Sequence, residues 1–200
     1  MFSDLVNALN QAEKSFDPDE LAFLALTSKI EQPFRDRLAY ALAGPAVESG
    51  GRIAREYKRG DIAWLIGQAP KAIVELKACY TRDLITQPEI YLRYLKSDLQ
   101  KAAACGGPDC GCFAVLLATH PRSSVPPEIF DTIKYARKVN SEIKKYGNPE
   151  EVRQLAEVKA RSHLHQLGPT HEFCWSLGAY LGIQVDLLGW LVEARALGAN

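Results

Sequence analysis

Residues 60–80 read GDIAWLIGQAPKAIVELKACY and contain two apolar runs, residues 62–66 and 72–76. The turn-forming residues 67–70, Gly-Gln-Ala-Pro, separate the two runs. Short apolar runs that flank a turn containing Gly and Pro are typical of a β-hairpin. We therefore predict two antiparallel strands here, at the centre of the fold.

Charged residues within this hairpin follow the alternation of a strand. Glu75 and Lys77 lie two residues apart, so they project from one face, whereas Val74 and Leu76 project from the other. Asp61 is expected near the first pair, because a hairpin in which Ile66 faces Lys71 across the turn places Asp61 within about one residue of Glu75. The predicted result is a cluster of two carboxylates and one amine at one end of an apolar sheet.

Such a cluster has a chemical use. Adjacent carboxylates raise each other's pKa unless a cation lies between them. Mg²⁺ is the usual cation, because it prefers oxygen ligands and keeps water and phosphate oxygens in its remaining positions. A neighbouring amine can orient an attacking water, help to deprotonate it, or offset charge that develops on phosphorus. The alternative is an amphipathic strand on which Glu75 and Lys77 form a weak, exposed ion pair.

The spacing of these residues resembles a known motif. Asp61, thirteen intervening residues and then Glu75-Leu76-Lys77 in an apolar strand are similar to the core of the PD-(D/E)XK nucleases, the restriction-endonuclease-like superfamily. The chain departs from the family pattern in one respect, because Gly60 stands where the pattern has proline.

The resemblance extends beyond the motif. An amphipathic helix that carries Glu31 lies upstream, and a helix with the sequence KSDLQK at residues 96–101 lies downstream, followed by an apolar strand at residues 112–119. This order of helix, strand hairpin, helix and strand is similar to the family core over residues 28–120. The expected organisation is a single domain, residues 1–200, with a helical and strand part at residues 121–200.

The resemblance implies an α/β fold with a restriction-endonuclease-like core, in which a central mixed sheet is flanked by helices. It also implies a Mg²⁺-dependent nuclease, with Mn²⁺ as a substitute, that hydrolyses phosphodiester bonds of nucleic acid, with DNA as the favoured substrate. A non-catalytic nucleic-acid-binding or assembly module on the same scaffold is the alternative. A homodimer is compatible with either function.

Individual roles also come from the resemblance. Asp61 and Glu75 would bind the metal together with the backbone carbonyl of Leu76, and Lys77 would position the nucleophilic water. Glu31 on the upstream helix would complete the site, with two weaker alternatives on that helix, Asp36 and Glu48.

Composition limits the classes of protein to consider. The 200 residues are 47% hydrophobic and 24% charged, which is ordinary for a globular domain. Lys plus Arg equals Asp plus Glu at 24 each, so any surface for nucleic acid must be local. No apolar run is long enough to span a bilayer, and no secretory signal is evident. Five cysteines without such a signal suit a reducing cytoplasm.

Two further stretches carry chemistry. Cys105, Cys110 and Cys112 lie in one Gly/Pro-containing stretch of eight residues, 105–112. They could contribute to a zinc or iron–sulfur site, and reduced structural thiols are the favoured alternative. A basic stripe on a helix could hold phosphates, or could be a solvated helix face. Its members are Lys134, Arg137, Lys138, Ser141 and Lys145.

Other elements are predicted from periodicity and helix-capping residues. Helices are expected from Ser3 to about Lys14, from Asp17, over residues 28–44, 88–104, 126–146 and 149–168, and as a short helix at 170–180. Strands are expected at 52–59, 113–118 and 182–192.

Overall fold

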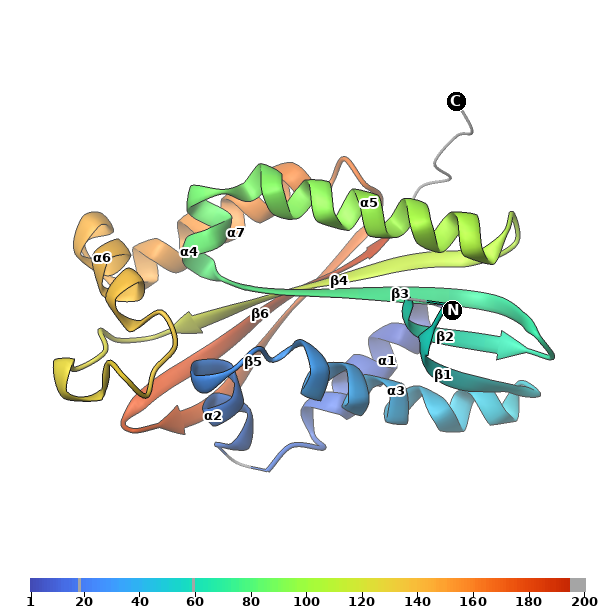
Figure 1. The fold of residues 1–200 in the computed structure, drawn as a ribbon, viewed down its shortest axis with the longest axis horizontal. Helices are drawn as coiled ribbons and strands as arrows, with labels where there is room; N and C mark the ends of the chain where they lie inside the picture. The colour runs from blue at the N-terminus through green and yellow to red at the C-terminus, as the bar shows by residue number, and fades with distance from the viewer. Residues whose placement is uncertain (18, 59, 195–200) are drawn as a thin grey trace.

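The computed structural model describes residues 1–17, 19–58 and 60–194. Six strands form one mixed sheet in the order β1-β2-β3-β4-β6-β5 (Figure 1). β3 and β4 are parallel, and every other neighbouring pair is antiparallel. The strands are β1 (Gly51–Tyr57), β2 (Gly60–Ile66), β3 (Ala69–Tyr80), β4 (Gly111–Pro121), β5 (Thr170–Tyr180) and β6 (Ile183–Glu193). The prediction of an α/β fold with a central mixed sheet is confirmed.

Helices cover both faces of the sheet (Figure 1). One face carries α1 (Phe2–Glu13), α2 (Glu20–Thr27) and α3 (Glu31–Glu48), and the other carries α4 (Thr81–Thr86), α5 (Pro88–Gly106) and α7 (Pro149–Leu164). A 3₁₀ helix, Pro127–Ile129, precedes α6 (Ala136–Tyr146), which lies beyond one end of the sheet. Each face has its own apolar core, as expected for a sheet that buries both faces.

The central hairpin forms as predicted, with a different register at its turn. Ile66 pairs with Ala69, and not with Lys71. A bulge between Trp64 and Leu65 then shifts the pairing, so that Ile62 faces Val74. Asp61 is therefore brought beside Glu75, one step beyond the last paired residues.

The alternation predicted for β3 is confirmed. Val74 and Leu76 are buried in the core under α1–α3, whereas Ile73 and Cys79 belong to the core under α5 and α7. Glu75 has the parity of the second set, and therefore projects from the face covered by α5.

Two predicted helices are wrong. Residues 170–180 form β5, because their large apolar residues alternate with polar ones and pair with β6. The single helix predicted at 126–146 is broken, because the N–H of Lys134 donates to Leu26 O at 2.7 Å and Tyr135 has a left-handed φ of 60°. Tertiary contact thus overrides local helix propensity in this segment.

Several predicted boundaries move. α3 continues through Pro45 to Glu48, so the predicted stop at residue 44 is wrong. Pro45 lies in the last turn, where it removes only one hydrogen bond. The predicted strand at 52–59 ends at Tyr57, and Pro18 and Arg59 lie outside the described residues.

Candidate functional site

β3 has an open edge over residues 76–80, because its pairing with β2 ends at Val74 while its pairing with β4 continues to Tyr80. Carboxylates accept hydrogen bonds from alternate N–H groups of this edge. They are Asp61 from Leu76 at 2.8 Å, Glu31 from Ala78 at 3.1 Å and Asp83 from Tyr80 at 3.1 Å. Side chains from β2, α3 and α4 thus supply the acceptors that a neighbouring strand would otherwise give to this edge.

Asp61 and Glu31 therefore contact the same edge of β3. The N–H groups of Leu76 and Ala78 are two residues apart, which is about 7 Å along a strand. The N–H and C=O of a strand residue point to the same edge, so the Leu76 carbonyl lies on the edge that Asp61 contacts. Three of the five predicted site groups therefore meet at the open edge.

Glu75 and Lys77 lie beside that edge, on the face covered by α5. The side chain of Glu75 is only 6% exposed. Lys77 Nζ lies 2.9 Å from Asp98 Oδ2, and Lys101 Nζ lies 2.9 Å from the other oxygen of Asp98. α5 therefore supplies a third carboxylate, and we call Asp61, Glu75 and Asp98 the carboxylate cluster.

The pKa of Glu75 is raised to about 8. Burial is the largest cause, followed by the negative charges of Asp61 and Asp98, while Lys77 acts in the opposite direction. A hydrogen bond to Asp61 also favours the protonated form. At neutral pH, Glu75 therefore retains its proton in the protein without metal, as expected of carboxyl groups that share a buried site.

The pKa of Lys77 is raised despite its partial burial. Burial alone would lower this pKa, but the hydrogen bond and charge of Asp98 outweigh it, and the charges of Glu31 and Asp61 add to the effect. Lys77 is therefore a cation at neutral pH. Its amine can orient water and offset negative charge, but in this state it has no lone pair with which to act as a base.

The other acids of α3 are placed elsewhere. Asp36 pairs with Arg35 and with Arg55 of β1, at 3.2 and 2.9 Å. Glu48 is exposed at the last residue of α3. Of the predicted alternatives on this helix, Glu31 is thus the one that contacts β3.

The donors at this site suit Mg²⁺ better than a metal that needs a complete protein cage. No three His, Cys, Asp or Glu side chains within the described residues are grouped as metal ligands. Asp61 and Glu75 supply two carboxylates, and the Leu76 carbonyl lies on the same edge. Mg²⁺ is usually held by one or two carboxylates, with water and substrate phosphates in its other positions. The high pKa of Glu75 fits a place for a cation, since a cation would allow the carboxyl group to ionise.

The three clustered cysteines do not form a ligand set. Cys105 lies in the last turn of α5, whereas Cys110 and Cys112 flank the start of β4, and all three are free thiols. Burial raises the pKa of Cys110 to about 12, with a further contribution from Cys112. The thiol of Cys110 therefore stays protonated at neutral pH and is a poor nucleophile.

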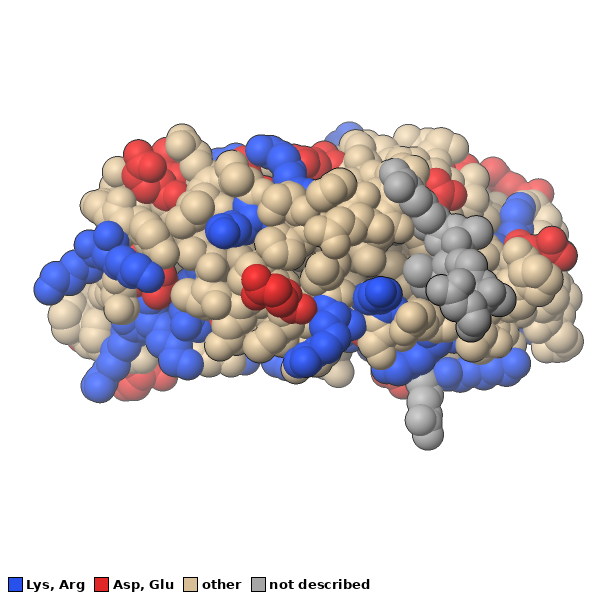
Figure 2. All heavy atoms as spheres, turned by 90° about the horizontal axis from the view of Figure 1, so that it is seen from above, with Lys and Arg blue, Asp and Glu red and all other residues tan. Residues whose placement is uncertain are grey.

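The members of the basic stripe that lie on α6 are exposed, whereas Lys134 precedes the helix and is half-buried. Figure 2 shows Lys and Arg gathered at the end of the molecule where α6 lies. Ala136, Val139 and Ile143 face the core, so the lysines and Arg137 of α6 point outward. Lys138 lies over the ring of Tyr135 at 5.5 Å, and exposed aromatic rings beside cations suit contact with nucleic acid.

The arginines of β1 are already engaged. Arg52 donates to Gly67 O and to Gln68, and Arg55 pairs with Asp36. These two arginines are therefore less available to phosphates than the cations of α6.

Two contributions were not assigned from the sequence. Asp98 appears there only as a polar residue of a helix, although its spacing from Lys101 is that of a helical ion pair. Asp83 closes the open edge through a capping box at the start of α4, with Tyr80 as the N-cap. The N-cap is an aromatic residue here, so the usual Ser/Thr signature is missing.

Comparisons of the chain with protein-family models, with curated proteins and with solved structures find no match. No described helix combines the length and apolarity needed to cross a membrane.

Proposed function

We propose that this protein is a Mg²⁺-dependent nuclease that hydrolyses phosphodiester bonds of nucleic acid, with DNA as the favoured substrate. The observation that carries the proposal is the meeting of Asp61, Glu75, Lys77 and Glu31 where β3 separates from β2. These charged residues come from two strands and a helix. They surround the buried carboxyl group of Glu75, whose raised pKa is what a bound cation would relieve.

The order of elements supports the proposal. α3, the β1–β2–β3 strands, α5 and β4 follow one another, with only the short α4 inserted before α5. β4 lies parallel to β3 at the centre of the sheet. This is the order of helix, strand hairpin, helix and strand on which the resemblance to the PD-(D/E)XK nucleases rests.

Each residue has a chemical role in this proposal. Asp61 and Glu75 would hold Mg²⁺ with the Leu76 carbonyl, and Glu31 holds β3 in place by accepting from the Ala78 N–H. When bound, Mg²⁺ activates water and stabilises charge on the phosphate and the leaving oxygen. Lys77, kept protonated by Asp98, positions the attacking water and offsets the developing charge.

One observation favours the alternative, a non-catalytic nucleic-acid-binding or assembly module on the same scaffold. Asp61 and Glu31 already satisfy backbone N–H groups, and Lys77 already pairs with Asp98. Such contacts stabilise the fold without any metal. The two functions differ in whether the wild type cleaves nucleic acid, and in whether that cleavage needs Lys77.

The test is a cleavage assay on single- and double-stranded DNA and on RNA, with Mg²⁺ or Mn²⁺. Lys77→Ala should abolish cleavage and change the free energy of unfolding by no more than about 1 kcal/mol, because Asp98 keeps Lys101. Lys96→Ala, an exposed position on α5, is the matched control and should cleave as the wild type does. Cleavage by Lys77→Ala at the wild-type rate, or none of these substrates cleaved by the wild type, would overturn the proposal.

A further inference from the structure

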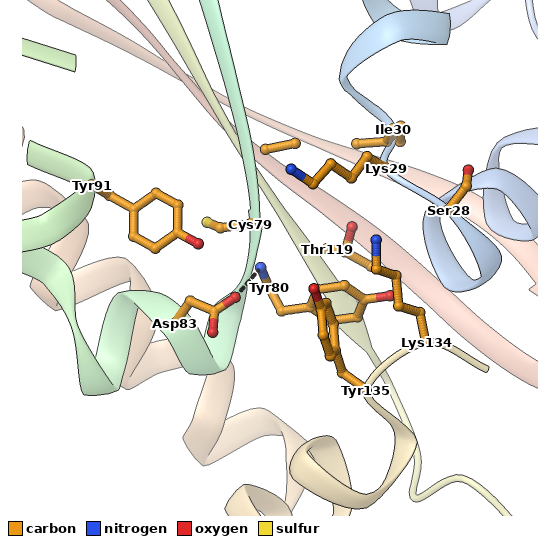
Figure 3. Close-up of a pocket in the computed structure, with 11 residues that line it drawn as sticks. Ser28, Lys29, Ile30, Cys79, Tyr80, Asp83, Tyr91, Thr119, Lys134 and Tyr135 are labelled. Carbon is orange, nitrogen blue, oxygen red and sulfur yellow. Dashed lines mark hydrogen bonds between the residues drawn. The ribbon is translucent and has the colours of Figure 1, made fainter. Parts of the chain in front are cut away.

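A cavity of about 140 Å³ lies beside the open edge of β3, beyond the carboxylate cluster (Figure 3). It is bounded by the last residues of β3, the residues before α3, one residue each of α4, α5 and β4, and the segment before α6. We call this cavity the edge pocket. Its polar lining side chains include Lys29, Asp83, Tyr91, Thr119 and Lys134.

Two cations from distant segments converge on the edge pocket. The amine ends of Lys29 and Lys134 both point toward the space beside the end of β3 (Figure 3). Neither amine forms an ion pair with a carboxylate of the described residues. The one carboxylate in the lining, Asp83, accepts from the Tyr80 N–H at 3.1 Å and pairs with Arg82 at 2.7 Å. Asp83 and Arg82 balance each other, and the two lysines outnumber Glu31, whose carboxylate contacts the Ala78 N–H, so a net positive charge remains at the edge pocket.

Hydroxyl groups complete the lining. Burial raises the pKa of Tyr91, so its phenol remains a hydrogen-bond donor. Thr119 adds a second hydroxyl from β4. Two ammonium groups with hydroxyl donors are the groups that bind phosphate oxygens. The volume is below the roughly 300–1,000 Å³ of pockets that enclose a whole small molecule, so the edge pocket suits one group and not an entire nucleotide.

The position of the edge pocket relates it to the candidate nuclease site. Ala78 and Tyr80, which line the edge pocket, lie two and four residues beyond Leu76 on the same strand. This separation is about 7 to 13 Å, or roughly two to four nucleotides of a stacked strand at 3.4 Å each.

We propose that the edge pocket binds a phosphate group of the nucleic-acid strand that is cleaved at the carboxylate cluster, and so sets the position of that strand. Cleavage of the bound strand rests on the proposed nuclease function, whereas phosphate binding in the edge pocket does not. Lys134 also begins the basic stripe of α6, so the bound strand continues from the edge pocket toward that helix.

Binding without cleavage tests the edge pocket. The affinity for a single-stranded oligonucleotide is measured in EDTA over a range of salt, for the wild type and for Lys29→Gln with Lys134→Gln. The double variant should bind more weakly, and the slope of log K against log salt should fall by about 0.7 for each lost contact. Lys29→Arg should restore the slope lost in Lys29→Gln, and Lys144→Gln, an exposed α6 control, marks the effect of a lysine outside the edge pocket.

A second measurement locates the bound phosphate. Single neutral methylphosphonates are placed along the oligonucleotide, and each is tested with the wild type and the double variant. One internal position that weakens the wild type but not the double variant supports the proposal. The assignment to a continuous strand is overturned if the affinity falls only when a terminal phosphate is removed. It is also overturned if no methylphosphonate lowers the affinity and only added inorganic phosphate does.

The outcomes separate this inference from the proposed function. Wild-type cleavage together with an unchanged salt slope in the double variant overturns the edge pocket and leaves the nuclease proposal standing. A reduced slope in a protein that cleaves nothing supports phosphate binding and overturns the nuclease proposal.

Discussion

The carboxylate of Asp61 accepts a hydrogen bond from the backbone N–H of Leu76 at 2.8 Å, two residues beyond the last β3 residue paired with β2. A side chain thus takes the position at which a β2 carbonyl would continue the ladder. The same carboxylate raises the pKa of Glu75. Asp61 therefore has two roles: it accepts the Leu76 N–H, and its charge raises the pKa of Glu75. Substitution by Asn and by Ala separates these roles.

Asp61→Asn keeps an oxygen that can accept from the Leu76 N–H and removes the charge beside Glu75. We expect its melting temperature without metal to equal or exceed that of the wild type. Asp61→Ala leaves the N–H without its partner and should lose about 1–3 kcal/mol of unfolding free energy. Thermal and urea unfolding of both variants check this prediction, and equal losses in the two would contradict it.

The metal response of the same variants follows from the proposed site. Mg²⁺ should stabilise the wild type by about 2.7 kcal/mol at a hundredfold excess over its dissociation constant, and should barely stabilise Asp61→Asn. Melts at constant ionic strength, with and without Mg²⁺, make the comparison. An equal response of the two proteins would rule out Asp61 as a ligand.

The basic stripe of α6 gives a prediction that is independent of the edge pocket. Lys138 and Lys145 lie over Tyr135 and Tyr146, at 5.5 and 4.9 Å from the ring centres. Replacing both lysines with Gln should weaken binding to every sequence alike and reduce the salt slope by about one for each lost phosphate contact. The control is Lys14→Gln, which lies at the end of α1. An unchanged slope would identify the stripe as a solvated helix face.

The hairpin and its charged residues could be predicted because strand alternation is a local property. The i, i+2 spacing of Glu75 and Lys77 determines their common face, whatever packs above them. The bulge in this hairpin, which leaves Lys71 of β3 without a partner on β2, could not be predicted, since it depends on how the turn closes. Burial of Glu75, and hence its raised pKa, depends on the packing of α5.

The largest error, the helix predicted at 170–180, had a contrary signal in the sequence. Phe173, Trp175 and Leu177 alternate with the small residues Cys174 and Ser176, which is the period of a strand. Leu181 and Gly182 follow with φ of 50° and 77°, the left-handed pair of a tight hairpin. The edge pocket could not be predicted, because Lys29 and Lys134 meet only through tertiary packing.

The corrected β5–β6 hairpin makes a stability prediction. A Cβ added to Gly189 would overlap the ring of Phe173 on the paired strand. Gly189→Ala should therefore destabilise the protein by about 1–3 kcal/mol, since a packed ring must move. Gly44→Ala in α3, where an added Cβ meets nothing within 4 Å, is the control and should be neutral or stabilising. Urea unfolding measures both, and a neutral Gly189→Ala would contradict this packing.

The last prediction concerns pH. The pKa of Glu75 is about 8 in the folded protein, against an ordinary 4.5, because of burial and then of Asp61 and Asp98. Between these values the folded protein binds a proton that the unfolded chain releases. Glu75 therefore makes the unfolding free energy fall as pH rises from about 4.5 to about 8, by about 1.4 kcal/mol per pH unit, which is the reverse of an ordinary carboxylate.

Glu75→Gln has no proton to lose and should lack this slope. Urea unfolding of both proteins at about pH 5 and about pH 8 should thus show the wild type losing stability relative to the variant as pH rises. Glu48→Gln, which is exposed, controls for removal of an acid elsewhere and should follow the wild type. Bound Mg²⁺ favours the ionised form of Glu75, so in the wild type it should flatten the slope. Parallel pH profiles of wild type and Glu75→Gln without metal would show that Glu75 ionises normally, and would remove the electrostatic argument for a cation at this site.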